Sequence, residues 1–101
     1  MSHPTTGLDE TVHQRVRLGI LAVLAEADKV DFTYLRDRLD VTDGNLNRHL
    51  QVLGEAGYVQ IEKRPNGRRK TWILATRRGR EAFTAHLVRL QQIIDASKET
   101  T

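Results

Sequence analysis

The sequence predicts a single, mainly α-helical domain that carries a small β-hairpin. Three features in the middle of the chain indicate this fold class. Two short apolar-patterned segments are separated by a few turn residues, a glycine follows the second segment, and two strand-like segments then flank a turn sequence. This order predicts two helices joined by a tight turn and followed by a hairpin, within residues 31–74.

The two short helices are predicted at residues 32–39 and 43–56. Asp31 precedes the first and Thr42 the second. Both residue types cap helices, because a side-chain oxygen accepts a hydrogen bond from a free N–H group of the first turn. Only two residues, 40 and 41, remain between the first helix and the second cap, so the connection must be a tight turn.

The second short helix is amphipathic. Its leucines recur at spacings of four and three residues, which places them on one face of a helix: Leu46, Leu50 and Leu53. The opposite face is polar and rich in amide side chains. We therefore expect the leucines to be buried and the polar face to point away from the core.

A basic hairpin is predicted over residues 58–74. Gly57 lies where the preceding helix should end, because glycine adopts the left-handed conformation of a C-terminal cap without steric penalty. Residues 65–67 are Pro-Asn-Gly, which favours a turn between the two strands. Residues 62–80 carry eight basic side chains and one acidic one, although the formal net charge of the chain is only +3. This asymmetry indicates a polyanionic partner.

Longer helices are expected at residues 10–27 and 77–96. The first is apolar nearly all round and needs covering on two sides. The second carries apolar residues at alternating steps of four and three, the pattern of paired helices. Together they predict a homodimer, although the last helix could instead pack only on its own domain. The expected interface residues are Leu18, Leu21, Phe83, Leu87, Leu90 and Ile94.

The composition excludes several classes of protein. The 101 residues include no cysteine, so there is no disulfide framework and no thiol nucleophile. No segment approaches the roughly 18 apolar residues of a membrane span, and residues 1–8, expected to be a flexible N-terminus, lack a signal-peptide pattern. A cytoplasmic location is therefore expected. We find no phosphate-binding glycine loop or paired carboxylates, so neither enzymatic activity nor a cofactor is expected.

The histidines do not predict a metal site. The chain has four of them, His3, His13, His49 and His86. Imidazole is a common metal ligand, but these spacings match no compact site. His86 is expected at the surface of the last helix.

Several segments together resemble the winged-helix transcriptional regulators of bacteria and archaea, in the MarR-like and ArsR-like group. The resemblance covers about residues 10–90. Its carriers are VRLGIL (16–21), FTYL (32–35), TDGNLNRHL (42–50), LGEAGYV (53–59) and LATRRGR (74–80). The resemblance implies a winged helix-turn-helix fold. It also implies a homodimer. The second short helix of each subunit would then lie in one of two successive major grooves of DNA, with the hairpins, or wings, along the flanking DNA backbone.

On this interpretation the second short helix reads DNA. Asn45 and Arg48 are expected to contact bases, because an amide can pair with adenine and a guanidinium with guanine or a phosphate. Asp43 suits the helix dipole and can accept from cytosine, and the resemblance implies that His49 contacts phosphate or its helix neighbours. The full set of expected contacts is Thr42, Asp43, Gly44, Asn45, Asn47, Arg48, His49 and Gln51 in the helix, with Arg64, Arg68, Arg69 and Lys70 in the hairpin.

The sequence thus predicts a sequence-specific regulator of transcription that binds double-stranded DNA. A dimeric repressor with a pseudo-palindromic operator is favoured over an activator. Two alternatives remain, a winged-helix module that binds an acidic protein in a larger assembly and a nonspecific DNA-packaging protein. A small-molecule effector, if there is one, is expected between the last helix and the reading unit.

Overall fold

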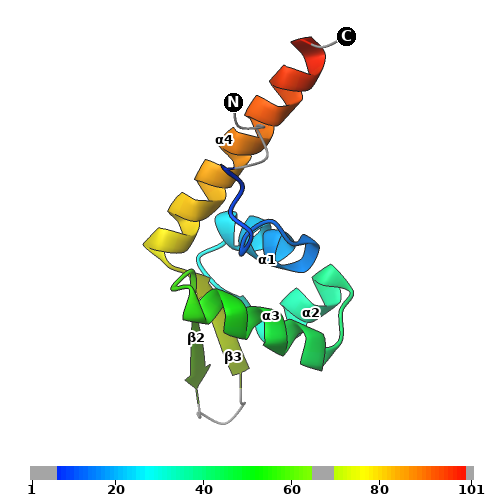
Figure 1. Cartoon of the computed structure of the whole chain (residues 1–101). Helices are drawn as coiled ribbons and strands as arrows, with labels where there is room; N and C mark the ends of the chain where they lie inside the picture. The colour runs from blue at the N-terminus through cyan, green and yellow to red at the C-terminus, as the bar shows by residue number, and fades with distance from the viewer. Residues whose placement is uncertain (1–6, 65–69, 100–101) are drawn as a thin grey trace.

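The computed structural model describes residues 7–64 and 70–99, which form four helices and a small antiparallel sheet (Figure 1). The expected fold class is confirmed. The elements are, in order, α1 Arg15–Ala25, β1 Val30–Asp31, α2 Phe32–Leu39, α3 Asp43–Glu55, β2 Val59–Arg64, β3 Lys70–Ala75 and α4 Arg77–Glu99.

Side-chain caps fix the start of α2 and of α3. The Asp31 carboxylate accepts a hydrogen bond from the backbone N of Tyr34 at 2.8 Å, and Thr42 Oγ1 accepts from the backbone N of Asn45 at 3.1 Å. Between the two helices, Asp40 has a φ of 53° and ends α2 in the left-handed conformation. These local interactions define the tight turn that orients α3 against α2.

The sheet has three strands in the order β1-β3-β2. The β2–β3 hairpin is the expected wing, and its register runs from Val59 opposite Ala75 to Arg64 opposite Lys70. Strand β1, which sequence analysis did not predict, has two residues and pairs with β3 through Val30 opposite Ile73. Two residues are too few to show an alternating pattern, so only the pairing with a distant strand defines β1.

Helix α1 begins later than expected, at Arg15 rather than near residue 10. The side chain of Gln14 accepts hydrogen bonds from the backbone N atoms of Val16 and Arg17, at 2.8 and 2.9 Å, and so caps the helix. The carboxylate of Asp9 accepts from backbone N–H groups of a separate preceding turn. The chain before Gln14 therefore forms a turn that folds back on the domain instead of extending α1.

The core lies where α1, α2 and α3 meet the sheet, and it contains the expected leucine stripe of α3. Leu21, which we expected at a dimer interface, is instead 2% exposed and belongs to the chain's own core. Helix α1 is covered on more than one side because α2, α3, α4 and β3 all contact it. The buried apolar residues are Val12, Val16, Ile20, Leu21, Leu24, Val30, Leu35, Leu46, Leu50, Leu53, Val59 and Ile73.

Helix α4 starts against the base of the wing and then leaves the body of the domain. Thr76 Oγ1 accepts a hydrogen bond from Gly79 N at 3.0 Å and donates one to Gly57 O at 2.6 Å. The helix continues to Glu99 and projects from the domain, on the side opposite to the hairpin (Figure 1). The radius of gyration is accordingly 15.5 Å, against about 13 Å for a compact chain of 100 residues. Over the described ranges, no helix combines the length and the apolar character that a membrane span requires.

Candidate nucleic-acid interface

The exposed face of α3 is polar and has a glycine in its first turn. Gly44, Arg48 and Gln51 follow one another at helical spacing and are exposed, with exposed Asn47 beside them. The buried stripe of leucines lies on the opposite face. Nothing lies within 4 Å of the position that a Cβ atom would occupy at Gly44. At the N-terminal end of α3, this face is therefore exposed and carries no large side chain at Gly44.

Two of the expected contact residues on α3 already have protein partners. The Asp43 carboxylate accepts a hydrogen bond from Arg36 Nη1 at 2.9 Å, and Gln51 Nε2 donates to Glu55 Oε1 at 3.3 Å. Thr42 caps the helix, as described above. The exposed side chains of Asn47 and Arg48 therefore dominate the centre of this surface.

The side chains of Asn45 and His49 are more buried than expected. Asn45 is half-buried, and its Oδ1 atom is buried with no hydrogen-bond partner among the described residues. His49 is only 7% exposed and faces α1, where its Nδ1 lies 3.2 Å from Arg17 Nη1. Burial, followed by the charge of Arg17, lowers the pKa of His49. The neutral ring can then accept the arginine hydrogen bond, and His49 is not part of the exposed face of α3.

Strand alternation assigns the wing residues to two faces. Ile61 lies opposite Ile73, and Lys63 opposite Thr71, so these four residues share one face of the hairpin. Ile73 is fully buried under the helices, which identifies this face as the one that packs against them. The exposed Lys63 therefore extends from the helix-packing side of the wing. Lys63 is not among the contact residues expected from the sequence, although it continues the alternation of Val59 and Ile61.

Lys70 lies on the other face of the hairpin. Its Nζ is 5.5 Å from the centroid of the Trp72 ring, and Lys29 Nζ is 4.8 Å from the same centroid. Both ammonium groups are thus placed for cation–π contacts with Trp72. Arg68, Arg69 and the side chain of Arg64 fall outside the described part of the chain, and their contacts with DNA stay predictions.

Helix α3 and the wing lie at the same end of the molecule. In Figure 1 the hairpin extends past α3 at the end of the domain from which α4 points away. The core side chains of α3 and the wing strands belong to one cluster, which fixes their relative position. A partner that contacts α3 and the wing together would therefore lie at this end of the molecule.

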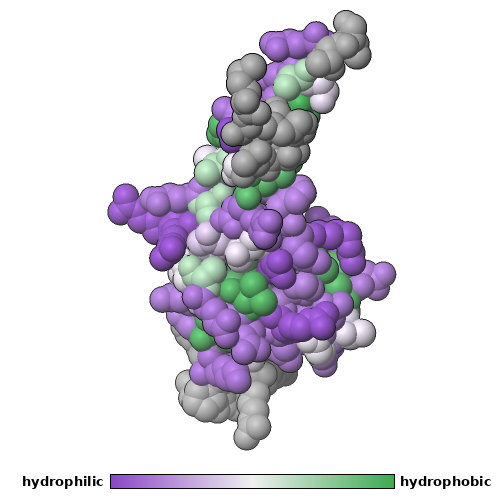
Figure 2. Space-filling view, viewed as in Figure 1, coloured by the Kyte–Doolittle hydropathy of each residue, from purple (hydrophilic) through white to green (hydrophobic). Residues whose placement is uncertain are grey.

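Helix α4 exposes apolar side chains where it leaves the domain. Leu87 and Ile94 are each 48% exposed and Val88 is 55% exposed. Phe83 packs partly against the core, and Leu90 is half-buried. Figure 2 shows hydrophobic groups along this projecting helix among hydrophilic ones. The C-terminal half of α4 thus has an apolar surface that the described part of its own domain leaves uncovered.

The turn that precedes α1 joins α4 to the base of the wing through polar contacts. The Tyr58 hydroxyl donates to Asp9 Oδ2 at 2.7 Å, which raises the pKa of Tyr58. His13 Nδ1 lies 3.3 Å from His86 Nε2. The expected surface position of His86 is wrong, because the ring is 2% exposed beneath this turn. No group of three or more metal-ligating residues occurs in residues 7–64 and 70–99.

Comparison with known proteins agrees with this architecture. The family profile described as a winged helix DNA-binding domain matches residues 16–94. An uncharacterised protein of Methanocaldococcus jannaschii, MJ0432, is 42% identical over 79 residues, which are 77% of this chain and 86% of that protein.

Solved structures show the same fold. A transcriptional regulator homologue from Pyrococcus horikoshii is 31% identical with a TM-score of 0.85, over 92% of this chain and 91% of that one. A MarR-family transcriptional regulator from Silicibacter pomeroyi is 19% identical with a TM-score of 0.70, over 93% of this chain and 63% of that one. The resemblance to winged-helix regulators is thereby confirmed, and the chain belongs to the winged helix DNA-binding domain family.

Proposed function

We propose that this DNA-binding regulator is a dimeric repressor that reads a pseudo-palindromic operator with α3. The observation that carries the proposal is the open polar face of α3 at the end of the domain where the wing projects. An α-helix fits the major groove of B-DNA, where amide and guanidinium groups can distinguish base pairs. Arg48 and Asn47 are the exposed α3 side chains best placed for that role, and Lys63 would contact the backbone.

Dimer formation is supported by the exposed apolar residues of α4. Soluble proteins bury large apolar surfaces, and a projecting helix can do so by pairing with its own copy around a twofold axis. Such a dimer would present two equivalent reading helices. It therefore favours an operator with two half-sites about one turn of DNA apart.

The hollow between α4, α1 and β3 is small for an effector site. A hollow of about 160 Å³ lies there, lined by Leu21, Ala25, Ala75, Gly79, Arg80, Phe83 and Thr84. Ligand pockets usually enclose about 300 to 1,000 Å³. An effector at this place would have to be very small, or would need α4 to move.

A gel-shift experiment tests the proposal. The purified chain is mixed with labelled DNA from upstream of its own gene, and unlabelled specific or unrelated DNA is added as competitor. We expect only the specific competitor to remove the shift, and a footprint long enough for two half-sites. Equal competition by unrelated DNA would indicate packaging instead, and no shift even at low salt would indicate a protein partner.

Arg48→Ala locates the reading surface, with Arg38→Ala as its control. Both arginines are exposed, but Arg38 is on α2 and borders a hollow formed with Trp72 and Glu26, away from the exposed face of α3. We expect Arg48→Ala to weaken specific binding by about 5- to 150-fold, the loss of about 1–3 kcal/mol for a good base contact. Arg38→Ala removes the same charge and should have only a small, sequence-independent effect. Equal losses in both variants would contradict the assignment of α3 as the reading helix.

A further inference from the structure

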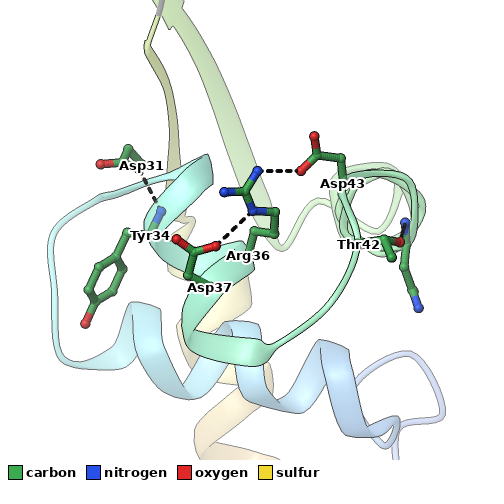
Figure 3. A network of polar contacts seen from close by, with 7 residues as sticks. Asp31, Tyr34, Arg36, Asp37, Thr42 and Asp43 are labelled. Atoms are coloured by element: carbon green, nitrogen blue, oxygen red, sulfur yellow. Dashed lines mark hydrogen bonds and ion pairs between the residues drawn. The ribbon is translucent and has the colours of Figure 1, made fainter.

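Arg36 lies between two carboxylates at the junction of α2 and α3. Its Nη1 donates to Asp43 Oδ1 at 2.9 Å and its Nε donates to Asp37 Oδ1 at 3.0 Å (Figure 3). The side chain of Arg36 is 33% exposed, whereas those of Asp37 and Asp43 are 66% and 64% exposed. The hydrogen bond that Arg36 donates to Asp43, together with the one to Asp37, raises the pKa of the guanidinium. The guanidinium therefore stays charged and holds both acids.

Asp43 places a negative charge on a surface that we propose binds a polyanion. Asp43 is the first residue of α3, one position before the open Gly44. A carboxylate at a helix N-terminus is stabilised by the helix dipole, but an unpaired one would repel DNA phosphates. The ion pair with Arg36 offsets that charge. It also holds the carboxylate in one orientation, with one oxygen engaged and the side chain still largely exposed.

A fixed carboxylate is a selective reader of bases. It only accepts hydrogen bonds, and the major groove offers amino donors on cytosine and adenine, whereas guanine and thymine present acceptors. An exposed acid that accepts from the amino group of cytosine is an established type of base contact. Recognition helices use their N-terminal residues to contact base edges. Asp43 is thus at the appropriate end of α3.

We propose that Arg36 is a positioning residue that holds Asp43 as the acceptor for the amino group of a cytosine. The proposal rests on the proposed function, because it needs α3 in the major groove. It assigns the cytosine contact to one residue, Asp43, and gives Arg36 a role in specificity without contact to DNA. Asp37 also accepts a hydrogen bond from Arg36, through Nε, but it lies on α2 and not on the reading helix.

Asp37 therefore provides a matched control for Asp43. Asp43→Ala and Asp37→Ala each remove one exposed carboxylate and one hydrogen bond to Arg36. Each variant also loses one negative charge, which should favour binding to every duplex by a similar, sequence-independent amount. Only Asp43→Ala should lose a base preference.

The test is selection of bound sequences from randomised duplexes by the full chain, followed by affinities for single-base variants. We expect wild type to prefer cytosine at one position of each half-site, with about 5- to 150-fold discrimination. Asp43→Ala should lose this preference at that position alone, Arg36→Gln should lose it as well, and Asp37→Ala should keep it. Arg36→Lys keeps the positive charge but lacks the planar guanidinium that donates to two carboxylates at once. We therefore expect this variant to lose most of the preference for cytosine.

The outcomes separate this proposal from the proposed function. Unchanged base preferences in Asp43→Ala would overturn the cytosine contact, and unchanged preferences in both Arg36 variants would overturn the positioning role. If wild type enriched no sequence, the proposed function itself would be contradicted. Thermal unfolding of each variant checks folding, and Arg36→Lys serves as the test of Arg36 if Arg36→Gln does not fold.

Discussion

Helices α3 and α4 are both amphipathic and both capped by a threonine, yet they expose opposite kinds of surface. Helix α3 buries all its leucines and leaves polar side chains outside. From Leu87 onward, α4 leaves leucine, valine and isoleucine side chains outside. A polar exposed face suits a charged, hydrated partner such as DNA, whereas an apolar one suits a protein surface. The two ends of this small domain therefore differ in surface chemistry, as the proposed DNA contact at α3 and the proposed dimer contact at α4 require.

Charging the apolar face of α4 should have the largest effect. The double variant Leu87→Glu/Ile94→Glu places two carboxylates on the predicted dimer seam, and we expect a monomer at concentrations where wild type is a dimer. Both side chains are about half exposed, so the fold itself should persist. Sedimentation equilibrium measures the oligomeric state, and binding to a full operator should fall with it.

The control for this variant is Ala85→Glu/Gln92→Glu. These exposed positions lie on the opposite side of α4 and receive the same two charges. We expect the control to remain a dimer. A monomeric wild type, or equal dissociation of both double variants, would contradict pairing through Leu87 and Ile94.

Gly79→Ala should destabilise the junction between α4 and the wing. A Cβ atom at Gly79 would overlap the backbone carbonyl oxygen of Tyr58 and lie 2.8 Å from its carbonyl carbon. Because backbone atoms cannot move aside cheaply, we expect a loss of about 1–3 kcal/mol in the free energy of unfolding. Denaturant unfolding measures it. Gly54→Ala on α3, where no atom lies within 4 Å of the new Cβ, is the control and should cause no loss.

The pH dependence of stability should report the two buried histidines. Burial lowers the pKa of each histidine below the ordinary 6.5. At His49 the charges of Arg17, Arg48 and Arg15 lower the pKa further. At His86 the neighbouring His13 also lowers the pKa, and Asp9 partly opposes this effect. The unfolded chain therefore binds protons first as pH falls. Stability should be constant above about pH 7.5 and fall as pH drops below 6.5.

Denaturant unfolding between pH 8 and pH 5 measures this dependence. Each histidine contributes a slope of at most about 1.4 kcal/mol per pH unit, between its ordinary pKa and its lowered one. His86→Gln should reduce the slope below pH 6.5, whatever it does to stability at pH 8. An unchanged slope would mean that His86 is not held neutral in the folded chain.

The sequence predicted the parts of the fold that depend on neighbouring residues. Asp31, Thr42 and Gly57 act within a few residues of themselves, and the starts of α2 and α3 follow from them. The pairing of β1 with β3 and the burial of His86 under the turn at His13 join residues more than forty positions apart. No local pattern could indicate those contacts.

The candidate site divides in the same way. Helical periodicity placed Gly44, Asn47, Arg48 and Gln51 on the exposed side of α3, where the structure has them. Periodicity alone did not show that His49 is sealed by Arg17 from α1, or that Arg36 from α2 engages Asp43. Those contacts depend on how helices pack, which the sequence of one helix does not specify.

Gly44→Ala should have the smallest effect on folding and separates stability from DNA binding. Alanine is favoured over glycine in helices by up to about 1 kcal/mol, with less gain in a first turn, and the new methyl group meets no atom within 4 Å. The variant should therefore unfold at a slightly higher denaturant concentration. If Gly44 allows the DNA backbone or base edges to approach α3 closely, the same methyl group should weaken binding.

Gly54→Ala adds the same methyl group ten residues further along α3, at the end away from the expected contact, and should leave DNA binding unchanged. Tighter binding by Gly44→Ala would show instead that a better formed helix matters more than close approach. The reading surface would then have to lie further along the helix, around Arg48 and Gln51.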